Sequence, residues 1–160
     1  MTTIFDLIND DTPLMEVEAF ITANPTCVSE FNSNYQTPLM MYCNMNRLDG
    51  VNLLIDKSAD VNQMNIYSWS ALMSSINNDN MDISRVLINN SANVNARCSG
   101  MSCLMRAVDF AFTDIVQLLV TNNVDKTYSN EGFTALQRAQ LYKTNSGTDR
   151  WDAIISLLST

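Results

Sequence analysis

One short pattern occurs four times at nearly constant spacing, and it limits the possible folds more than any other feature of this chain. The matching segments read YQTPLM, SWSALM, GMSCLM and GFTALQ. Their leucines are Leu39, Leu72, Leu104 and Leu136, at spacings of 33, 32 and 32 residues. A second apolar block and a short turn follow each leucine. A period in this range over most of a chain predicts an array of stacked repeats.

Each copy of the pattern also carries the start signal of a helix. A Ser or Thr side chain can accept a hydrogen bond from a free N–H group in the first helical turn, which contributes about 1 kcal/mol. The sequence places such a residue just before every repeat leucine, at Thr37, Ser70, Ser102 and Thr134. We therefore expect a first helix after each of these residues and a second helix in each following apolar block.

The repeats resemble the ankyrin repeat. Thr37-Pro38-Leu39, Leu53-Leu54 and Ala59-Asp60-Val61-Asn62 carry the resemblance most clearly, and it covers roughly residues 31–139. The resemblance implies an all-α fold, an ankyrin-repeat solenoid of stacked helix–loop–helix units joined by hairpin loops. One departure is that the usual repeat glycine is replaced by Tyr35 and Ser68 in two copies.

We expect a single ankyrin-repeat domain over residues 1–160, with repeats at 1–31, 32–63, 64–96, 97–127 and 128–160. The first and last repeats are expected to act as caps, with Thr12 as a helix N-cap in the first. In the last, the segment LYKTNSGTDR is expected to form an elongated loop before a final helix over residues 151–158. A complete small array is the preferred interpretation, and a fragment of a longer protein is the alternative.

The charge balance limits the class of partner. Nine Lys and Arg against seventeen Asp and Glu give a net charge of −8. Phosphate binding needs clustered basic side chains, so we expect neither a nucleic acid nor an anionic membrane surface as partner. The acidic residues crowd the N-terminal repeat, where they either keep an end repeat soluble or form a docking surface for a basic protein. We expect a monomer.

Residues for catalysis or for cofactor and metal binding are missing from the sequence. The chain has no His and only four Gly, all isolated, so it lacks both the usual proton carrier and a phosphate-binding loop. Its four Cys form no C-x-x-C pair and predict no zinc site. We therefore expect no enzyme, no cofactor and no metal, and the cysteines favour a reducing cytoplasm.

The resemblance implies a concave binding face lined by hairpin tips and by the ends of the first helices. In this chain those positions are apolar: Ile66, Tyr67, Trp69, Met101, Phe133, Met45, Phe110 and Tyr142. A solvated hairpin favours polar turn residues, so an exposed apolar row is unfavourable unless it is covered. Our hypothesis is that Tyr67 and Trp69 anchor a protein partner. The alternative is that these aromatic side chains fold onto neighbouring hairpins and brace the stack.

Two arginines, Arg106 and Arg138, occupy equivalent positions in adjacent first helices. They either form a small basic feature in an acidic protein or pair with Asp109 and Glu131. The second arrangement is the commoner one on protein surfaces.

The sequence thus predicts a non-catalytic protein–protein interaction module that binds a protein partner through its concave face, and the acidic charge leaves a basic partner as one option. One alternative is an acidic inhibitor of the immunity type that neutralises a basic toxin or enzyme. Another is a pathogen or viral effector that binds a host protein. Fold alone does not choose among them.

Overall fold

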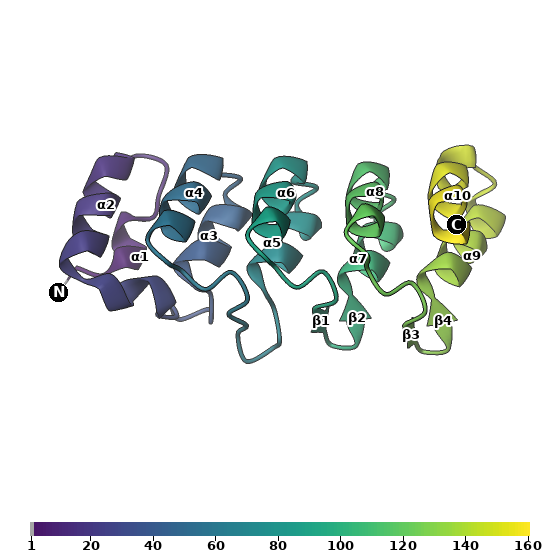
Figure 1. Ribbon diagram of the computed structural model, residues 1–160, viewed down its shortest axis with the longest axis horizontal. Coiled ribbons are helices and arrows are strands. Elements are labelled where there is room, and N and C mark those ends of the chain that lie inside the picture. Colours follow the sequence, from purple (N-terminus) through teal and green to yellow (C-terminus); the bar gives the residue numbers. More distant parts are fainter. Residues whose placement is uncertain (1) are drawn as a thin grey trace. The chain divides into compact units, whose positions relative to one another are not determined.

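The structure, a computed structural model, describes residues 2–160 (Figure 1). It consists of two compact units, a first up to Ala92 and a second from Asn93 to Thr160. The fold is all-α and is built from pairs of helices, as the repeat pattern predicts. The assignment of residues 1–160 to one domain stays a prediction.

Unit 1 contains three helix pairs. They are formed by α1 (Ile4–Leu7) and α2 (Leu14–Ala23), by α3 (Pro38–Asn44) and α4 (Leu48–Asp56), and by α5 (Ala71–Asn77) and α6 (Met81–Asn89), with a 3-10 helix η1 (Pro25–Ser29) after the first pair. α3 packs on α5 and α4 packs on α6, so equivalent helices of neighbouring repeats lie side by side. The fully buried side chains between them are those of the repeating apolar pattern, among them Leu39, Leu54, Leu72, Ile83 and Leu87.

Unit 2 contains two helix pairs, each preceded by a hairpin of two short strands. The first repeat comprises β1 (Arg97–Cys98), β2 (Met101–Ser102), α7 (Cys103–Asp109) and α8 (Thr113–Thr121). The second comprises β3 (Ser129–Asn130), β4 (Phe133–Thr134), α9 (Ala135–Ser146), a 3-10 helix η2 (Asp149–Trp151) and α10 (Asp152–Ser159). The strands pair antiparallel, and α7 packs on α9 as α8 packs on α10.

The four expected N-caps are confirmed. Each hydroxyl oxygen accepts a hydrogen bond at 3.2–3.3 Å from the backbone N–H three residues later, and the caps are Thr37, Ser70, Ser102 and Thr134. The expected cap at Thr12 is wrong, because Pro13 occupies the N-cap position of α2. The Thr12 hydroxyl donates instead to Oδ1 of Asn9, at 3.0 Å.

Each helix from α3 to α8 is followed by a left-handed residue that recurs with the repeat. After the first helices it is Asn46, Asp79 and Ala111, with φ between 52° and 58°. In each case the next N–H bonds back to the carbonyl five residues earlier, as from Phe112 to Ala107 at 2.9 Å. This bond pattern satisfies carbonyl groups that the helix end leaves free, and glycine is the residue it favours at the left-handed position.

Ala111→Gly should therefore stabilise unit 2. An L-residue in the left-handed region costs about 1–2 kcal/mol, and a glycine removes most of that cost. We expect the free energy of unfolding to rise by about 1 kcal/mol. The greater conformational entropy that glycine gives the unfolded chain reduces this gain. Urea unfolding followed by circular dichroism measures this. The matched control is Ala107→Gly inside α7, which should destabilise; a loss of stability from both variants would contradict the expectation.

The prediction of a long loop over residues 141–150 is wrong in its first half. α9 continues to Ser146, where Gly147 ends it in the left-handed conformation with φ 63°. The extended helix is held on its inner side, where Tyr142 Oη donates to Asp109; on its exposed side the Lys143 ammonium pairs with Asp152. Tertiary contacts thus override the weak helix propensity of the Thr, Asn and Ser residues in this segment.

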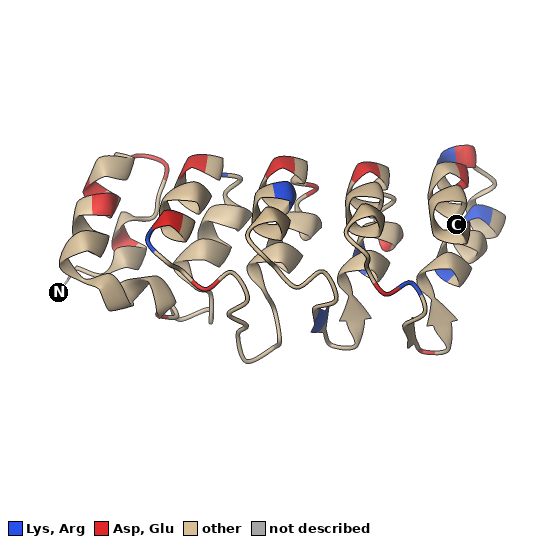
Figure 2. Cartoon of the chain, viewed as in Figure 1, with Lys and Arg blue, Asp and Glu red and all other residues tan. Residues whose placement is uncertain are grey.

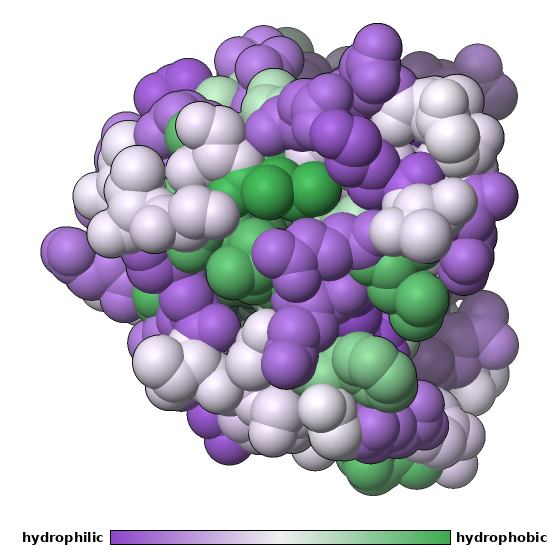
Figure 3. Space-filling view, turned by 90° about the vertical axis from the view of Figure 1, so that its right-hand side faces the viewer, coloured by the Kyte–Doolittle hydropathy of each residue, from purple (hydrophilic) through white to green (hydrophobic). Residues whose placement is uncertain are grey.

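The side of unit 2 on which α9 and α10 lie is shown in Figure 3, where hydrophilic side chains surround a central hydrophobic area. Two glutamines contribute to the polar surface. Gln137 and Gln140 are exposed in α9 at the positions where α7 carries the fully buried Met105 and Val108. The same helix position thus changes from apolar to polar where no further helix of the described chain packs against it.

Candidate partner-binding surface

Exposed hydrophobic side chains gather at one place in unit 1, on the turn before α3 and on the loop between α4 and α5. We call this set the hairpin patch; its five side chains are 43–67% exposed and belong to Phe31, Tyr35, Met64, Ile66 and Tyr67. The Tyr35 and Tyr67 rings meet edge to face, with centroids 5.9 Å apart and an interplanar angle of 88°. This geometry is favourable for two aromatic rings. The contact joins two consecutive hairpin tips.

Tyr35 holds a backbone conformation that suits glycine. Its φ is 57°, and the equivalent residues of the following repeats are Ser68, Gly100 and Gly132, with φ of 59°, 78° and 83°. A left-handed tyrosine costs about 1–2 kcal/mol. Burial of the ring offsets only part of this cost, because the side chain remains largely exposed. Such strain collects at functional sites more often than elsewhere.

A hollow of about 360 Å³ lies beside Tyr67. Two aromatic and four carboxamide side chains line it: Tyr67, Trp69, Asn34, Gln36, Asn44 and Asn65. The Asn65 Oδ1 accepts hydrogen bonds from the backbone N–H groups of Tyr67 and Trp69, at 2.9 and 3.0 Å, and so fixes the hairpin tip. A second hollow of about 200 Å³ lies among the other members of the hairpin patch. The surface therefore has two hollows in addition to its apolar side chains.

The hairpin patch carries no charge of its own. Residues 31–46 and 61–78 contain no Asp, Glu, Lys or Arg, and Figure 2 shows the loop between α4 and α5 without colour over this stretch. Two acidic residues border it, since Glu30 directly precedes Phe31 and Asp60 lies at the start of the loop between α4 and α5; the other acidic residues of unit 1 lie on the helices and their connecting turns. An uncharged partner surface therefore meets no unpaired charge when it covers the patch.

Three of the predicted site residues lie together at this surface. Ile66 and Tyr67 are exposed members of the hairpin patch. Trp69 lines the adjoining hollow, but it is only half-exposed because its Nε1–H donates to the Ser74 hydroxyl at 2.7 Å. This bond joins Trp69 to the following helix of its own repeat, so the choice between partner binding and bracing of neighbouring hairpins stays a prediction. Met45, the fourth predicted residue in unit 1, is half-buried at the end of α3.

The other predicted residues lie in unit 2. Met101 and Phe133 occupy the second strands of the two hairpins, half-buried and exposed respectively. Phe110 is exposed and stacks on Phe112, with ring centroids 5.4 Å apart. Tyr142 is partly buried, and its ring packs against Trp151 at 5.1 Å. A binding role for these residues stays a prediction.

Phe31, Tyr35 and Met64 were not among the predicted site residues. Phe31 and Tyr35 precede Tyr67 by a full repeat, so their approach depends on the stacking of repeats. One signal was visible in the sequence, namely a tyrosine where the repeat has glycine. An aromatic residue at a position that favours glycine has a conformational cost, and that cost marks it as a candidate for a specific role.

Arg138 forms an ion pair with Asp109, one of the two carboxylates expected as partners of the two arginines, whereas no ion pair of Glu131 is seen among the described residues. Nη1 of Arg138 lies 2.9 and 2.8 Å from the two carboxylate oxygens, and Tyr142 Oη donates to the same carboxylate at 2.9 Å. Burial and then the neighbouring carboxylate raise the pKa of Tyr142. These groups connect α7 with α9 inside unit 2, so their polar atoms serve the fold.

The cysteines are free thiols and all four are buried. Burial raises the pKa of the Cys103 thiol to about 12 and also raises the pKa of Cys43. Thiolate formation is therefore suppressed at both positions. Over residues 2–160 no three His, Cys, Asp or Glu residues are close enough together to bind a metal ion.

No helix within the described residues has the length and apolar character that a membrane crossing requires.

Comparison with known proteins agrees with the repeat architecture. A family model described as ankyrin repeats in three copies matches residues 7–98 and 39–130. A putative ankyrin repeat protein of Acanthamoeba polyphaga mimivirus is 37% identical over 90 residues, which are 53% of this chain and 55% of the viral protein. The ankyrin repeat and SAM domain-containing protein 6 of Rattus norvegicus is 32% identical over 102 residues, 61% of this chain but 12% of the rat protein.

Among solved structures, an ankyrin repeat domain from Acinetobacter baumannii superposes with a TM-score of 0.79. The alignment covers 89% of this chain and 72% of the bacterial one, at 21% identity. At this identity the likeness bears on the fold alone.

Proposed function

The chain belongs to the ankyrin-repeat family, and on this premise we propose that it binds a protein partner through the hairpin patch of unit 1. Ankyrin repeats are generally protein–protein interaction modules and are typically not catalytic. The specific element of the proposal is the place of contact, at Tyr35, Ile66 and Tyr67.

One observation carries this proposal. The chain keeps a tyrosine, Tyr35, in a left-handed conformation at a hairpin tip, and that ring is exposed and contacts the exposed ring of Tyr67. Stability alone would favour a glycine at this position. Tyrosine, in contrast, is among the residues that dominate binding energy at interfaces, because it covers a large area with few rotatable bonds.

The surroundings of the two rings suggest how a partner is held. Ile66 and the tyrosines offer apolar area, and the carboxamides of Asn34, Asn44 and Asn65 line the hollow beside it. Carboxamides both donate and accept hydrogen bonds, so they can pair with the main chain of a partner segment without a charge on either side. We propose that the partner presents an uncharged, partly apolar segment here.

Tyr67→Ala and Ile66→Ala are expected to weaken binding of that partner with little change in stability. Removing an interface tyrosine typically reduces the binding free energy by about 1–3 kcal/mol, a roughly 5- to 150-fold rise in Kd. Both side chains are largely exposed, so the melting temperature should hardly move. The partner is identified by capture from lysate with the wild-type chain, and each variant is then titrated with the purified partner by calorimetry.

The matched control is Leu141→Ala, which removes a similarly exposed apolar side chain from α9 in unit 2. Wild-type affinity in this control, combined with loss in the two hairpin variants, supports the site. Unchanged affinity in both hairpin variants would place the binding surface elsewhere. An equal drop in stability and affinity would instead assign the tyrosine a bracing role.

A second candidate function is inhibition of a basic protein, and the exposed carboxylates of the first repeat favour it. Asp6, Asp10, Asp11, Glu16 and Glu18 are all exposed on or beside α1 and α2. Opposite charge accelerates association and loses its effect as salt rises. An association rate that falls steeply with ionic strength would favour this candidate, whereas a flat response would favour the uncharged hairpin patch.

A viral or pathogen effector that binds a host protein through the same patch would show the same mutational pattern. The organism that supplies the captured partner distinguishes an effector from an adaptor of the cell's own proteins. For either role we propose a monomer in a reducing compartment such as the cytoplasm, in keeping with the free thiols.

A further inference from the structure

The long link between α9 and α10 forms a pocket in unit 2. The pairs α3–α4, α5–α6 and α7–α8 are each joined by three residues, 45–47, 78–80 and 110–112. In the last repeat α9 is longer, and Gly147, Thr148 and η2 precede α10. A pocket of about 360 Å³ opens beside this segment, lined by Tyr142, Asn145, Ser146, Thr148, Arg150 and Trp151. Three residues are sufficient to join paired helices in this fold, so the connection itself does not require the extra segment.

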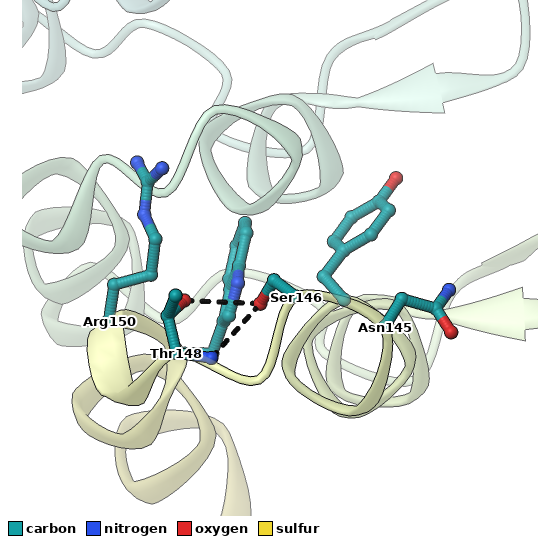
Figure 4. Close-up of a pocket in the computed structure, with 6 residues that line it drawn as sticks. Asn145, Ser146, Thr148 and Arg150 are labelled. Carbon is teal, nitrogen blue, oxygen red and sulfur yellow. Dashed lines mark hydrogen bonds between the residues drawn. The ribbon is translucent and has the colours of Figure 1, made fainter.

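Two aromatic rings and one cation give the pocket its chemical character. The Tyr142 and Trp151 rings pack at 5.1 Å, and the Arg150 guanidinium lies 5.3 Å from the centroid of the Trp151 ring. Figure 4 shows Arg150 and Asn145 at opposite ends of the row of lining side chains, with the hydrogen-bonded Ser146 and Thr148 between them. A ligand in this pocket therefore meets apolar ring surface together with hydroxyl, amide and guanidinium donors.

Arg150 differs from the two basic residues nearest to it in sequence. Arg138 is paired with Asp109 and Lys143 with Asp152, whereas Arg150 forms no ion pair with any described carboxylate. Its Nη2 donates to the backbone carbonyl of Phe110 at 3.3 Å, which holds the side chain in place. The positive charge of Arg150 thus remains available to an anionic group.

The indole of Trp151 supplies an independent indication of a ligand. The residue is only 6% exposed, and its Nε1 is enclosed without a hydrogen-bond acceptor among residues 2–160. A buried donor without a partner is rare in folded proteins and requires an explanation. The other tryptophan, Trp69, donates its Nε1–H to the Ser74 hydroxyl at 2.7 Å. An oxygen of a bound ligand, reached by a small shift of the ring, would satisfy Trp151 in the same way.

From these observations we propose that the pocket binds an organic carboxylate carried on an aromatic or branched apolar group. The Arg150 guanidinium binds the carboxylate, for which its planar donors are well suited. The apolar group packs on the rings of Tyr142 and Trp151. Since the Ser146 and Thr148 hydroxyls are hydrogen-bonded to each other, one of the two has a proton left to donate to the ligand. Such a carboxylate is either a free small acid or the C-terminal residue of a peptide chain. This site belongs to unit 2 and goes beyond the partner-binding function proposed above.

The two tryptophans allow a direct test by NMR on the full chain. The indole N–H signals of Trp69 and Trp151 are assigned with a Trp69→Phe variant and followed during titration with three probes. These are 3-phenylpropionate, an acetylated peptide ending in Phe with a free carboxylate, and the same peptide with a C-terminal amide. We expect a saturable shift of the Trp151 signal with a carboxylate probe, and no shift of the Trp69 signal.

Arg150→Gln should raise the Kd of the carboxylate probe at least tenfold, and Arg150→Lys should recover part of the affinity. The control is Arg85→Gln, which makes the same charge change on α6 in unit 1 and should leave the Kd unchanged. Binding of the small acid identifies a metabolite-sized ligand, and binding of the free-carboxylate peptide alone identifies a chain terminus. The proposal is overturned if no probe shifts the Trp151 signal at millimolar concentration, if the amide binds as well as the carboxylate, or if both Gln variants have equal effects.

Discussion

Replacing Gly50 by alanine is expected to destabilise unit 1 by about 3 kcal/mol or more, through overpacking between α3 and α4. A Cβ atom on Gly50 would lie 2.4 Å from Cδ1 of Tyr42 and 2.5 Å from its Cγ and Cε1. The Tyr42 ring is 1% exposed, so it has no free space into which to move. Because the rigid ring is held by the packed core, the two helices would have to separate to admit the methyl group.

The test is urea unfolding followed through Trp69 fluorescence, which reports on unit 1. The double variant Gly50→Ala/Tyr42→Leu should recover much of the lost stability, because the smaller side chain leaves room for the new methyl group. The matched control is Asn52→Ala, an exposed position of the same helix, where the change in stability should stay within about 0.5 kcal/mol. Near-wild-type stability of Gly50→Ala alone would show that α3 and α4 separate easily, contrary to the packing described.

The close contact between Gly50 and Tyr42 could not be predicted from the sequence, unlike the caps and the buried leucines. The caps at Thr37, Ser70 and Ser102 were predictable because each depends on a hydrogen bond within three residues of chain. The repeat leucines were predictable because burial follows a period. The Gly50–Tyr42 contact depends instead on how the side chains of two helices interlock, and no spacing in the sequence encodes that distance.

The length of α9 could not be predicted from the local sequence either. Thr144, Asn145 and Ser146 are weak helix formers, and their composition predicts a loop. The helix nevertheless includes them, because Tyr142 packs on Trp151 and donates a hydrogen bond to Asp109, which lies 33 residues earlier in the chain. Tertiary contacts therefore outweigh local helix propensity in this segment. The same segment, for which a loop was predicted, lines the pocket of unit 2.

The hairpin patch could be predicted from the sequence only in part. In the sequence Ile66 and Tyr67 are recognisable as apolar residues in a turn, whereas Tyr35 is recognisable only as a tyrosine at a glycine position of the repeat. Both observations point to the same surface once the repeats are stacked in register. Because Tyr35 is equivalent to Ser68, the residue that follows Tyr67, the repeat register alone places the two tyrosines at neighbouring hairpin tips.

Asp109→Ala is expected to destabilise unit 2 by about 2–3 kcal/mol, since it leaves a largely enclosed arginine and a tyrosine hydroxyl without their shared acceptor. The carboxylate binds both Arg138 and Tyr142, and the side chains of Asp109 and Arg138 are only 19% and 13% exposed. Because water screens this pair poorly, most of the loss should persist at high salt. Urea unfolding followed through Trp151 fluorescence, at low and at molar salt, measures both effects.

Two further variants separate the ion pair from general effects of the substitution. Adding Arg138→Met to Asp109→Ala should restore part of the stability, because it replaces the stranded charge with an apolar side chain of similar length. Asp152→Ala breaks the exposed pair with Lys143 and should change stability little, since exposed pairs are weak and screened. If Asp109→Ala and Asp152→Ala had the same small effect, the Asp109 network would be an exposed contact in solution, and α9 would have to be held against α7 by its apolar residues alone.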